Sequence, residues 1–369
     1  MPPIIVGAGP AGCAGAIALA HAGVEPVLLD RDAEPRDQLC GGFLSWRTAA
    51  QVRELGVEPA HLGARKVDRL ALFAGDRTVT LPLPGPSFGL SRRALDTALR
   101  ARALALGARL AVEHVRCIDG IAVLGRGRRW QGEGLFLATG KHDLRGHARP
   151  RRAADPALGL RLRLPATAAR TALLPGRIEL HLFDRGYAGI MLQEDGTANV
   201  CLAVRKSLLG RAGGEPSELL ARLGDGNPLF ALRLGDDWTA AAIETIGSVP
   251  YGWLAREADP GVFRLGDQAA VIPSLAGEGI SIALASGASA ARHWLARRGA
   301  GARDYQREIA ARAAPAMRAA KLAWWLAEGP ASARAGIALA RRCPPVLALL
   351  MQLSRIPPER VLAQPGGAP

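Results

Sequence analysis

The hydrophobic pattern of the first thirty residues predicts a strand, a tight turn, a helix and a second strand. Residues 4–6 form a short apolar run that stops at glycine, which indicates a buried strand. Residues 13–22 are rich in alanine and are followed by Gly23, as expected for a helix and its end. Residues 24–30 contain a second apolar run and finish on Asp30. We therefore expect a β-turn-α-β unit with an acidic residue at the end of its second strand.

The periodicity changes twice along the rest of the chain. Residues 94–107 carry leucine and alanine at helical spacing, and the following segment predicts short strands at 109–112, 121–124 and 134–140. Apolar and polar residues then alternate, which predicts antiparallel strands with one wet face. These alternating segments are 160–164, 178–182 and 198–204. After them, the pattern predicts a strand at 262–265, a helix at 280–297, and helices over 305–355 broken at Pro330 and Pro344-Pro345.

These elements predict an α/β protein with two interleaved domains. The expected Rossmann-like domain is discontinuous and comprises residues 1–158 and 252–300. A mainly antiparallel substrate domain is inserted at 159–251, and residues 301–369 form a helical C-terminal part whose tail after Pro357 is expected to be loose. The chain has 369 residues, of which 49% are hydrophobic and 22% charged, so it can bury a large core and is not intrinsically disordered.

The net charge of +14 at first favours an anionic partner such as nucleic acid or lipid. Only four of the 47 basic residues are lysine, however, and the arginines are dispersed without interleaved aromatic residues. We therefore expect no nucleic-acid partner. Five cysteines without a Cys-x-x-Cys pair, and seven histidines without ligand spacing, predict neither disulfides nor a metal site. The cysteine usage and an N-terminus without the basic segment of a signal peptide favour a cytoplasmic location. The sequence gives no indication of a stable protein partner.

The first chemical motif lies in the predicted turn. Gly7, Gly9 and Gly12 fit G-x-G-x-x-G, in which the glycines allow a tight turn, a close approach to pyrophosphate, and close packing of helix and strand. The N-terminus of the following helix supplies free N–H groups for phosphate. Asp30 follows 18 residues after Gly12, near the spacing of a ribose hydroxyl acceptor. Strand, helix and Asp30 together favour a dinucleotide site over an empty turn.

A second motif follows the predicted strand at 262–265. Asp267 lies where a carboxylate suits a sugar-alcohol hydroxyl, and Pro273, Gly277 and Gly279 form a turn that opens a long helix. Outward-facing N–H groups at such a helix start can stabilise negative charge on a reduced flavin ring. Together with the first motif, this segment indicates FAD rather than NAD.

With these motifs, the chain resembles flavoproteins of the para-hydroxybenzoate hydroxylase fold, the group A flavin monooxygenases. Within them it is most similar to the geranylgeranyl reductase-like branch, in particular to oxidoreductases found beside bacterial type III polyketide synthases. The resemblance covers nearly the whole chain. It is carried by Gly7–Gly12 with Asp30-Arg31, Cys40–Ser45, Ser91–Asp96, Ala138–Gly146, Glu179–Phe183 with Gly186–Gly189, Asn199–Val204, Pro250–Gly252 and Gly266–Gly287.

The resemblance implies a role for each matching residue. Gly7, Gly9, Gly12, Asp30 and Arg31 would hold the adenosine diphosphate half, and Arg92 would reach the phosphates or the flavin edge. The turn Ala138-Thr139-Gly140 would pack beside the adenine, and Asp267 would bind the ribityl chain. Finally, Pro273, Gly277, Gly279 and Ile280 would line the isoalloxazine, and Cys40-Gly41-Gly42 would pass close to it.

Three residues are catalytic candidates. Cys40 is a candidate because the loop that carries it borders the substrate in the prenyl-reductase relatives, with an inert buried thiol as the alternative. His142 and Tyr187 are candidates to deprotonate a phenol, with a loop hydrogen bond and sheet packing as their alternatives. No Trp-x-Trp-x-Ile-Pro segment occurs, which argues against halogenation.

The leading function implied is monooxygenation, in which NAD(P)H reduces FAD and a C4a-hydroperoxide hydroxylates an apolar alkylphenol or polyketide-like substrate. One alternative is a reductase that saturates prenyl or polyene double bonds, and another is a non-catalytic flavin-binding partner of a biosynthetic complex. The C-terminal helices, with Trp324-Trp325 and Arg341-Arg342, either pack over the substrate cavity or form a peripheral membrane contact that collects a lipid-like substrate.

Overall fold

The computed structural model describes residues 1–151 and 153–357, and the predicted loose tail lies outside them. One sheet of the structure is wholly parallel, with the order β16-β10-β1-β2-β6. Its strands are β1 Ile4–Val6, β2 Val27–Asp30, β6 Arg109–Val112, β10 Leu135–Leu137 and β16 Val262–Arg264. Helix α1, Pro10–His21, follows β1 directly. The predicted β-turn-α-β unit is thus confirmed.

Small residues bring the helices of this domain into unusually close contact. Helix α8, Gly279–Arg297, packs on α1, and a Cβ added at Gly287 would lie 2.2 Å from the carbonyl oxygen of Ala11. Helix α3, Arg92–Ala105, packs on the other flank of α1. This close packing fixes α8 relative to the β1–α1 turn, so that the N-terminal ends of both helices are held rigidly.

The second sheet has eight strands, in the order β15-β11-β14-β13-β12-β4-β5-β3. Adjacent strands in this sheet are antiparallel except for β12 and β4, which pair in parallel. The strands are β3 Phe43–Leu44, β4 Arg65–Ala74, β5 Arg77–Gly89, β11 Ala157–Leu164, β12 Gly176–Phe183, β13 Gly186–Leu192, β14 Ala198–Arg205 and β15 Glu244–Val249.

The predicted boundary, which assigns all of residues 1–158 to the Rossmann-like domain, does not agree with this strand order. Strands β3, β4 and β5 lie within residues 1–158, yet they belong to the second sheet. The sequence pattern of β5 concealed a strand because Pro82, Pro84 and Pro86 interrupt it, and prolines argue against a strand within a sheet. In the structure these prolines lie on the exposed side of β5, and Leu81 and Leu83 alternate with them towards the interior.

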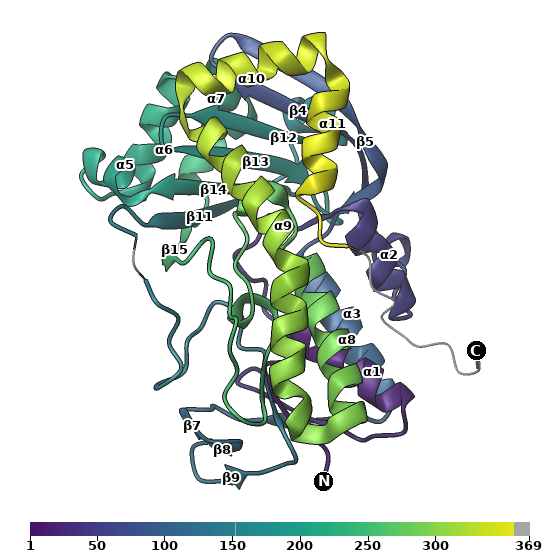
Figure 1. Cartoon of the computed structure of the whole chain (residues 1–369). Helices are drawn as coiled ribbons and strands as arrows, with labels where there is room; N and C mark the ends of the chain where they lie inside the picture. Colours follow the sequence, from purple (N-terminus) through teal and green to yellow (C-terminus); the bar gives the residue numbers. More distant parts are fainter. Residues whose placement is uncertain (152, 358–369) are drawn as a thin grey trace.

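Helices cover both faces of the second sheet. On one face lie α4 Ala168–Leu173, α5 Lys206–Arg211, α6 Pro216–Asp225 and α7 Pro228–Leu234, which enclose an apolar core with β11, β13 and β14. On the other face, α9 Ala302–Glu328, α10 Pro330–Arg342 and α11 Pro344–Leu353 enclose a second core with β4, β5 and β12. Figure 1 shows α10 and α11, in yellow, crossing these strands.

The remaining elements are small. Strands β7 Cys117–Asp119, β8 Ala122–Leu124 and β9 Arg129–Trp130 form a three-stranded sheet, and α2, Trp46–Glu54, lies between β3 and β4 in the chain. The breaks predicted at Pro330 and Pro344 are confirmed, since α10 and α11 begin there. No helix in the described part of the chain is long and apolar enough to span a bilayer.

Candidate active site

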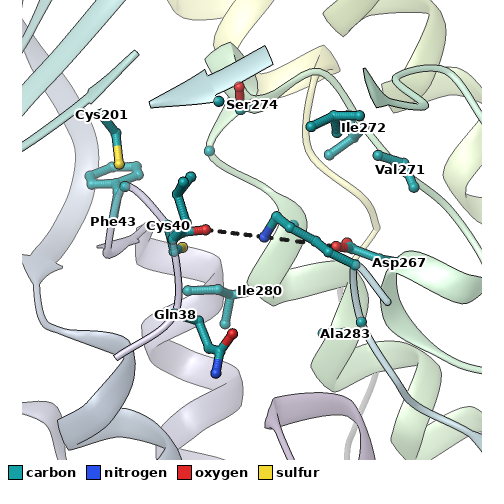
Figure 2. Close-up of a pocket in the computed structure, with 18 of the residues that line it drawn as sticks. Gln38, Cys40, Phe43, Cys201, Asp267, Val271, Ile272, Ser274, Ile280 and Ala283 are labelled. Atoms are coloured by element: carbon teal, nitrogen blue, oxygen red, sulfur yellow. Dashed lines mark hydrogen bonds and ion pairs between the residues drawn. The ribbon is translucent and has the colours of Figure 1, made fainter. Parts of the chain in front are cut away.

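A single cavity of about 1260 Å³ reaches from the β1–α1 turn into the second sheet. Its polar end is lined by the glycine turn, the end of β2, the 38–42 loop and the start of α8. Its other end lies between β4, β12 and β13 and the covering helices α9 to α11. Figure 2 shows where Cys40, Ile280 and Asp267 border the space between the two domains. The arrangement suits a dinucleotide at one end and an apolar molecule at the other.

The glycine turn leaves room for a ligand only at Gly9. A Cβ at Gly7 or Gly12 would lie 2.3 Å from Ala138 O or 1.9 Å from Gly7 O, so these two glycines serve internal packing. A Cβ at Gly9 would meet protein only at the ordinary distance of 3.5 Å, from Arg92 Nη2, and Gly9 lines the cavity. This is the cradle expected for a pyrophosphate at the start of α1, so the turn fits FAD.

Asp30 is already engaged by the backbone around it. Its carboxylate accepts hydrogen bonds from Ala8 N at 2.7 Å and Asp32 N at 3.0 Å. These contacts fix the carboxylate at the cavity wall, where it can still accept from a ribose hydroxyl. The neighbouring Arg31 Nη2 lies 3.4 Å from Nε2 of His142. The structure therefore places His142 beside Arg31, at the end of the cavity where we expect the adenosine.

Arg92 lies beside the glycine turn but does not project freely. It forms a bidentate ion pair with Asp96 on the same face of α3, with distances of 2.9 and 2.7 Å. The pair holds the guanidinium in one orientation against the cavity, close to Gly9. This position agrees with the phosphate contact that the resemblance implies for Arg92, which stays a prediction.

Lys141 connects three segments that sequence reasoning had treated separately. The turn Ala138-Thr139-Gly140 lines the cavity just before it. Lys141 Nζ donates to Leu39 O at 3.2 Å and lies 3.9 Å from Asp267 Oδ2. An ammonium group here places positive charge in the cavity beside the predicted ribityl-binding carboxylate. Lys141 belongs to the motif Ala138–Gly146, but nothing in its sequence spacing indicates this contact.

The loop Cys40-Gly41-Gly42 is held from the second sheet. Asn199 of β14 donates from Nδ2 to Cys40 O at 3.0 Å and to Gly41 O at 2.9 Å. The Cys40 thiol accepts from Gly42 N at 3.4 Å, and Gly42 has a φ of +71° that favours glycine. Cys201 lines the same region, and burial raises the pKa of its thiol to about 12, so that it stays protonated. All three loop residues line the cavity.

We expect Asn199→Ala to weaken FAD binding by roughly tenfold, because two loop carbonyls lose their donor and the loop loosens. The chain offers a matched control, since its only other asparagine, Asn227, also donates to a carbonyl, that of Leu223 at 2.8 Å. Asn227→Ala should leave FAD affinity unchanged. Quenching of flavin fluorescence during titration of the apoprotein measures both, and equal affinities would contradict the role given to Asn199.

The turn before α8 is stabilised by a buried ion pair. Glu278 is fully buried and accepts from Ser45 Oγ at 3.0 Å and from Arg355 Nη1 at 2.8 Å. Arg355 also donates to the Ala276 carbonyl. Burial raises the pKa of Glu278, although Arg355 and Ser45 oppose the shift. Arg355 thus ties the C-terminal segment to the turn predicted to line the flavin.

The predicted turn residues are placed as follows. Gly277 takes a φ of +66°, and Gly277, Gly279 and Ile280 all line the cavity. Pro273 is the exception, because it is buried and does not line the cavity. The first backbone N–H groups of α8 have no acceptor within the helix, as at any helix start, and they lie at the cavity wall.

Three hydroxyl groups meet where the polar and apolar parts of the cavity join. Tyr187 OH donates to Ser274 Oγ at 2.7 Å, and Tyr251 OH donates to the same oxygen at 2.8 Å. Both rings pack on Trp324 of α9, with centroids 5.8 and 4.9 Å away. Burial raises the pKa of both phenols, so they remain neutral donors. We call Tyr187, Tyr251 and Ser274 the hydroxyl cluster.

The hydroxyl cluster changes the predicted roles of Tyr187 and His142. Tyr187 acts as a base only as a phenolate, and its raised pKa favours a hydrogen-bonding role instead. Burial and the charge of Arg31 lower the pKa of His142, which is therefore neutral near pH 7. Its contacts are with Arg31 and not with the hydroxyl cluster. Ser274 and Tyr251 belong to the motifs Gly266–Gly287 and Pro250–Gly252, but only the fold reveals that their hydroxyl groups meet.

Beyond the hydroxyl cluster, the cavity wall is almost entirely apolar. Leucine and isoleucine side chains from the sheet face those of α9, α10 and α11. They are Leu70, Leu72, Leu83, Ile178, Leu180, Leu182, Leu326, Ile337, Leu347 and Leu350, with Met191 and Met351. Among the described residues, no group of His, Cys, Asp and Glu is arranged to hold a metal ion.

Comparison with known proteins agrees with this geometry. Residues 1–105 match the FAD binding domain family. The menaquinone reductase of Mycobacterium tuberculosis is 28% identical over 336 residues, covering 78% of this chain and 75% of the relative. The digeranylgeranylglycerophospholipid reductase 2 of Methanopyrus kandleri is 29% identical over 318 residues, covering 77% of this chain and 74% of the relative.

Solved structures show the same fold at lower identity. The probable FAD-dependent monooxygenase PqsL from Pseudomonas aeruginosa aligns with a TM-score of 0.71 and 16% identity, covering 91% of this chain and 99% of the other. A geranylgeranyl bacteriochlorophyll reductase-like protein from Thermoplasma acidophilum aligns with a TM-score of 0.69 and 16% identity, covering 95% and 98%. The chain is therefore an FAD-dependent oxidoreductase of the para-hydroxybenzoate hydroxylase fold, similar to the geranylgeranyl reductase-like proteins.

Proposed function

We propose that this oxidoreductase hydroxylates the ring of an uncharged phenolic or polyketide-like substrate that carries a long apolar chain. The observation that supports this most directly is the hydroxyl cluster at the junction of the cavity. It offers a polar anchor beside the turn of Gly277 and Gly279, while the wall beyond it suits an alkyl chain. A substrate bound this way has its polar ring towards the flavin site and its chain under α10 and α11.

The hydroxyl cluster is a hydrogen-bond donor to any ligand. A serine hydroxyl has one proton and two lone pairs, and the two tyrosines donate to the oxygen of Ser274. No described residue accepts the proton of Ser274, which is exposed in the cavity. Ser274 is therefore set to donate to a substrate oxygen. Such a donor stabilises the phenolate form of a phenol, which is the electron-rich form that hydroxylation needs.

Bound FAD supplies the redox and oxygen chemistry, and we propose NAD(P)H as the electron donor. One oxygen atom enters the ring as a hydroxyl group, and the other leaves as water. The protein contributes the anchor at Ser274, a rigid turn at Gly277 to Gly279, and an apolar wall that excludes water. Among the described residues, Arg355 is the one charged side chain that lines the apolar part of the cavity, and it is paired with Glu278.

A second candidate function is saturation of double bonds in a prenyl or polyene chain. The names of the two curated relatives, both reductases, support it. The two functions differ in their need for oxygen. We expect the purified protein with bound FAD, NADPH and a long-chain alkylphenol to consume oxygen and to form a product 16 Da heavier. Turnover without oxygen, with a product heavier by two hydrogens, would replace our proposal with the reductase.

We expect Ser274→Ala to raise KM for the phenolic substrate about tenfold, because the anchoring hydrogen bond is lost. Ser274→Thr keeps the hydroxyl group and should restore most of the affinity. Ser207→Ala is the matched control, since Ser207 also accepts from a side chain, Arg185 at 2.7 Å, but it lies on α5. Steady-state kinetics measure all three. An unchanged KM in Ser274→Ala would show that Ser274 does not anchor the substrate.

A further inference from the structure

The helices that cover the apolar end of the cavity carry exposed apolar side chains on their outer side. Val346, Leu349 and Leu353 recur at helical spacing on α11 and are 45%, 59% and 54% exposed. Leu339 at the end of α10 is 50% exposed, and Trp325 of α9 is 69% exposed. We call these five residues the outer apolar face. Val346, Leu349 and Leu353 adjoin one another on one side of α11, and adjoining exposed residues of this size mark an interaction surface rather than ordinary surface composition.

The cavity opens at the outer apolar face. Leu339 and Val346 are exposed to solvent and also line the cavity. They flank the connection between α10 and α11, and Leu347 and Leu350 continue the lining inwards towards the hydroxyl cluster. Figure 1 shows this connection at the outer end of the molecule, away from the FAD-binding domain. An apolar chain can therefore pass from the surface to the interior without crossing a polar barrier.

The helical segment that carries the outer apolar face is strongly basic. Residues 318–353 contain five basic residues and one acidic residue, a net charge of +4. The acid, Glu328, is held in a bidentate pair with Arg205 at 2.6 and 2.8 Å. The basic residues are Arg318, Lys321, Arg334, Arg341 and Arg342, all exposed. None of them forms a salt bridge within the part of the chain that the structure describes.

We propose that the outer apolar face docks on an anionic lipid bilayer and that the substrate chain enters the cavity directly from the membrane. Leucine and tryptophan side chains insert at the interface, and the unpaired arginines contact anionic headgroups. The charge distinguishes this partner from a second copy of the chain, because two faces of charge +4 repel each other. The entry of substrate rests on the proposed function, whereas the docking does not.

Flotation of the FAD-bound protein with lipid vesicles tests the docking without substrate, oxygen or reductant. The protein should float with phosphatidylcholine vesicles that contain about one third phosphatidylglycerol, and not with phosphatidylcholine alone. Leu349→Glu should lower vesicle binding about tenfold or more, because an inserted side chain becomes charged. Leu232→Glu is the matched control, since Leu232 on α7 is 52% exposed on the opposite face of the sheet, and it should bind like the wild type.

A second pair of variants tests the charge. Arg341→Glu/Arg342→Glu should lower binding at least tenfold, and Arg303→Glu/Arg307→Glu, at exposed positions near the start of α9, should have a much smaller effect. Flavin absorbance and circular dichroism confirm that each variant is folded. No flotation of the wild type, equal loss in the control variants, or a dimer in sedimentation velocity that Leu349→Glu dissociates would overturn the proposal. If the protein binds vesicles as expected but does not hydroxylate a phenol, the proposed function is wrong and the docking proposal is still supported.

Discussion

Replacing Gly9 with valine is expected to abolish FAD binding while leaving the apoprotein folded. A Cβ added at Gly9 lies no closer than 3.5 Å to protein atoms, so we expect the fold to accept a side chain there. The same side chain fills the cradle at the start of α1, where the phosphates would contact backbone N–H groups. We expect affinity for FAD to fall at least 100-fold, or about 2.7 kcal/mol.

Two other glycine variants separate ligand contact from folding. Gly12→Val should prevent folding, because its Cβ would lie 1.9 Å from the carbonyl oxygen of Gly7. Gly127→Val should leave binding unchanged, since nothing lies within 4 Å of its Cβ. Circular dichroism and flavin titration of the purified proteins measure the two effects. Normal FAD binding by Gly9→Val would show that the cradle does not hold the pyrophosphate.

Replacing Arg355 with methionine is expected to lower the free energy of unfolding by about 3–5 kcal/mol at neutral pH, because Glu278 becomes a buried charge without its partner. Arg222→Met is the control, since its pair with Glu218 at 2.7 Å is exposed and should cost about 0–1 kcal/mol. Urea unfolding measures both. The double variant Glu278→Gln/Arg355→Met should recover most of the loss, because no unpaired charge remains.

The cost of Arg355→Met should depend on pH with a defined sign. Burial raises the folded-state pKa of Glu278 above its ordinary value of 4.5, and loss of Arg355 raises this pKa further. The folded variant therefore binds a proton more tightly than the unfolded chain does. Its deficit should be smallest below pH 4.5 and grow as pH rises through the raised pKa. A deficit that is constant from pH 4 to pH 8 would show that lost packing on Trp46, not charge, destabilises the variant.

Local sequence patterns correctly predicted the elements whose conformation is determined by neighbouring residues in the chain. The unit from β1 to β2, helix α8 and the breaks between the C-terminal helices agree with their predicted positions. The fold class is confirmed as well. The motif glycines were recognisable because each is required by a close backbone contact, that of Gly12 with Gly7 inside the turn and that of Gly7 with Ala138 after β10. Such constraints leave a fixed spacing in the sequence, whatever surrounds them.

Contacts between segments that are distant in the chain are not marked by any such spacing in the sequence. Tyr187, Tyr251 and Ser274 come from a strand, a loop and a turn, and only the assembled sheet brings their hydroxyl groups together. Glu278 and Arg355 are 77 residues apart, and a charged residue in a sequence is by default assigned to the surface. Strand β5 was missed for a different reason, since its three prolines are typical of a loop rather than of a strand.

The parallel pairing of β4 with β12 has a consequence for synthesis on the ribosome. Strand β4 ends at residue 74 and β12 at residue 183, so 109 residues must be added before this edge of β4 finds its partner. At about 5–20 residues per second, this takes roughly 5–20 s. During that time the β4–β5 hairpin presents an unpaired strand edge that can join to another nascent chain. The parallel sheet is completed later still, because β16 and α8 follow all eight strands of the second sheet in the chain.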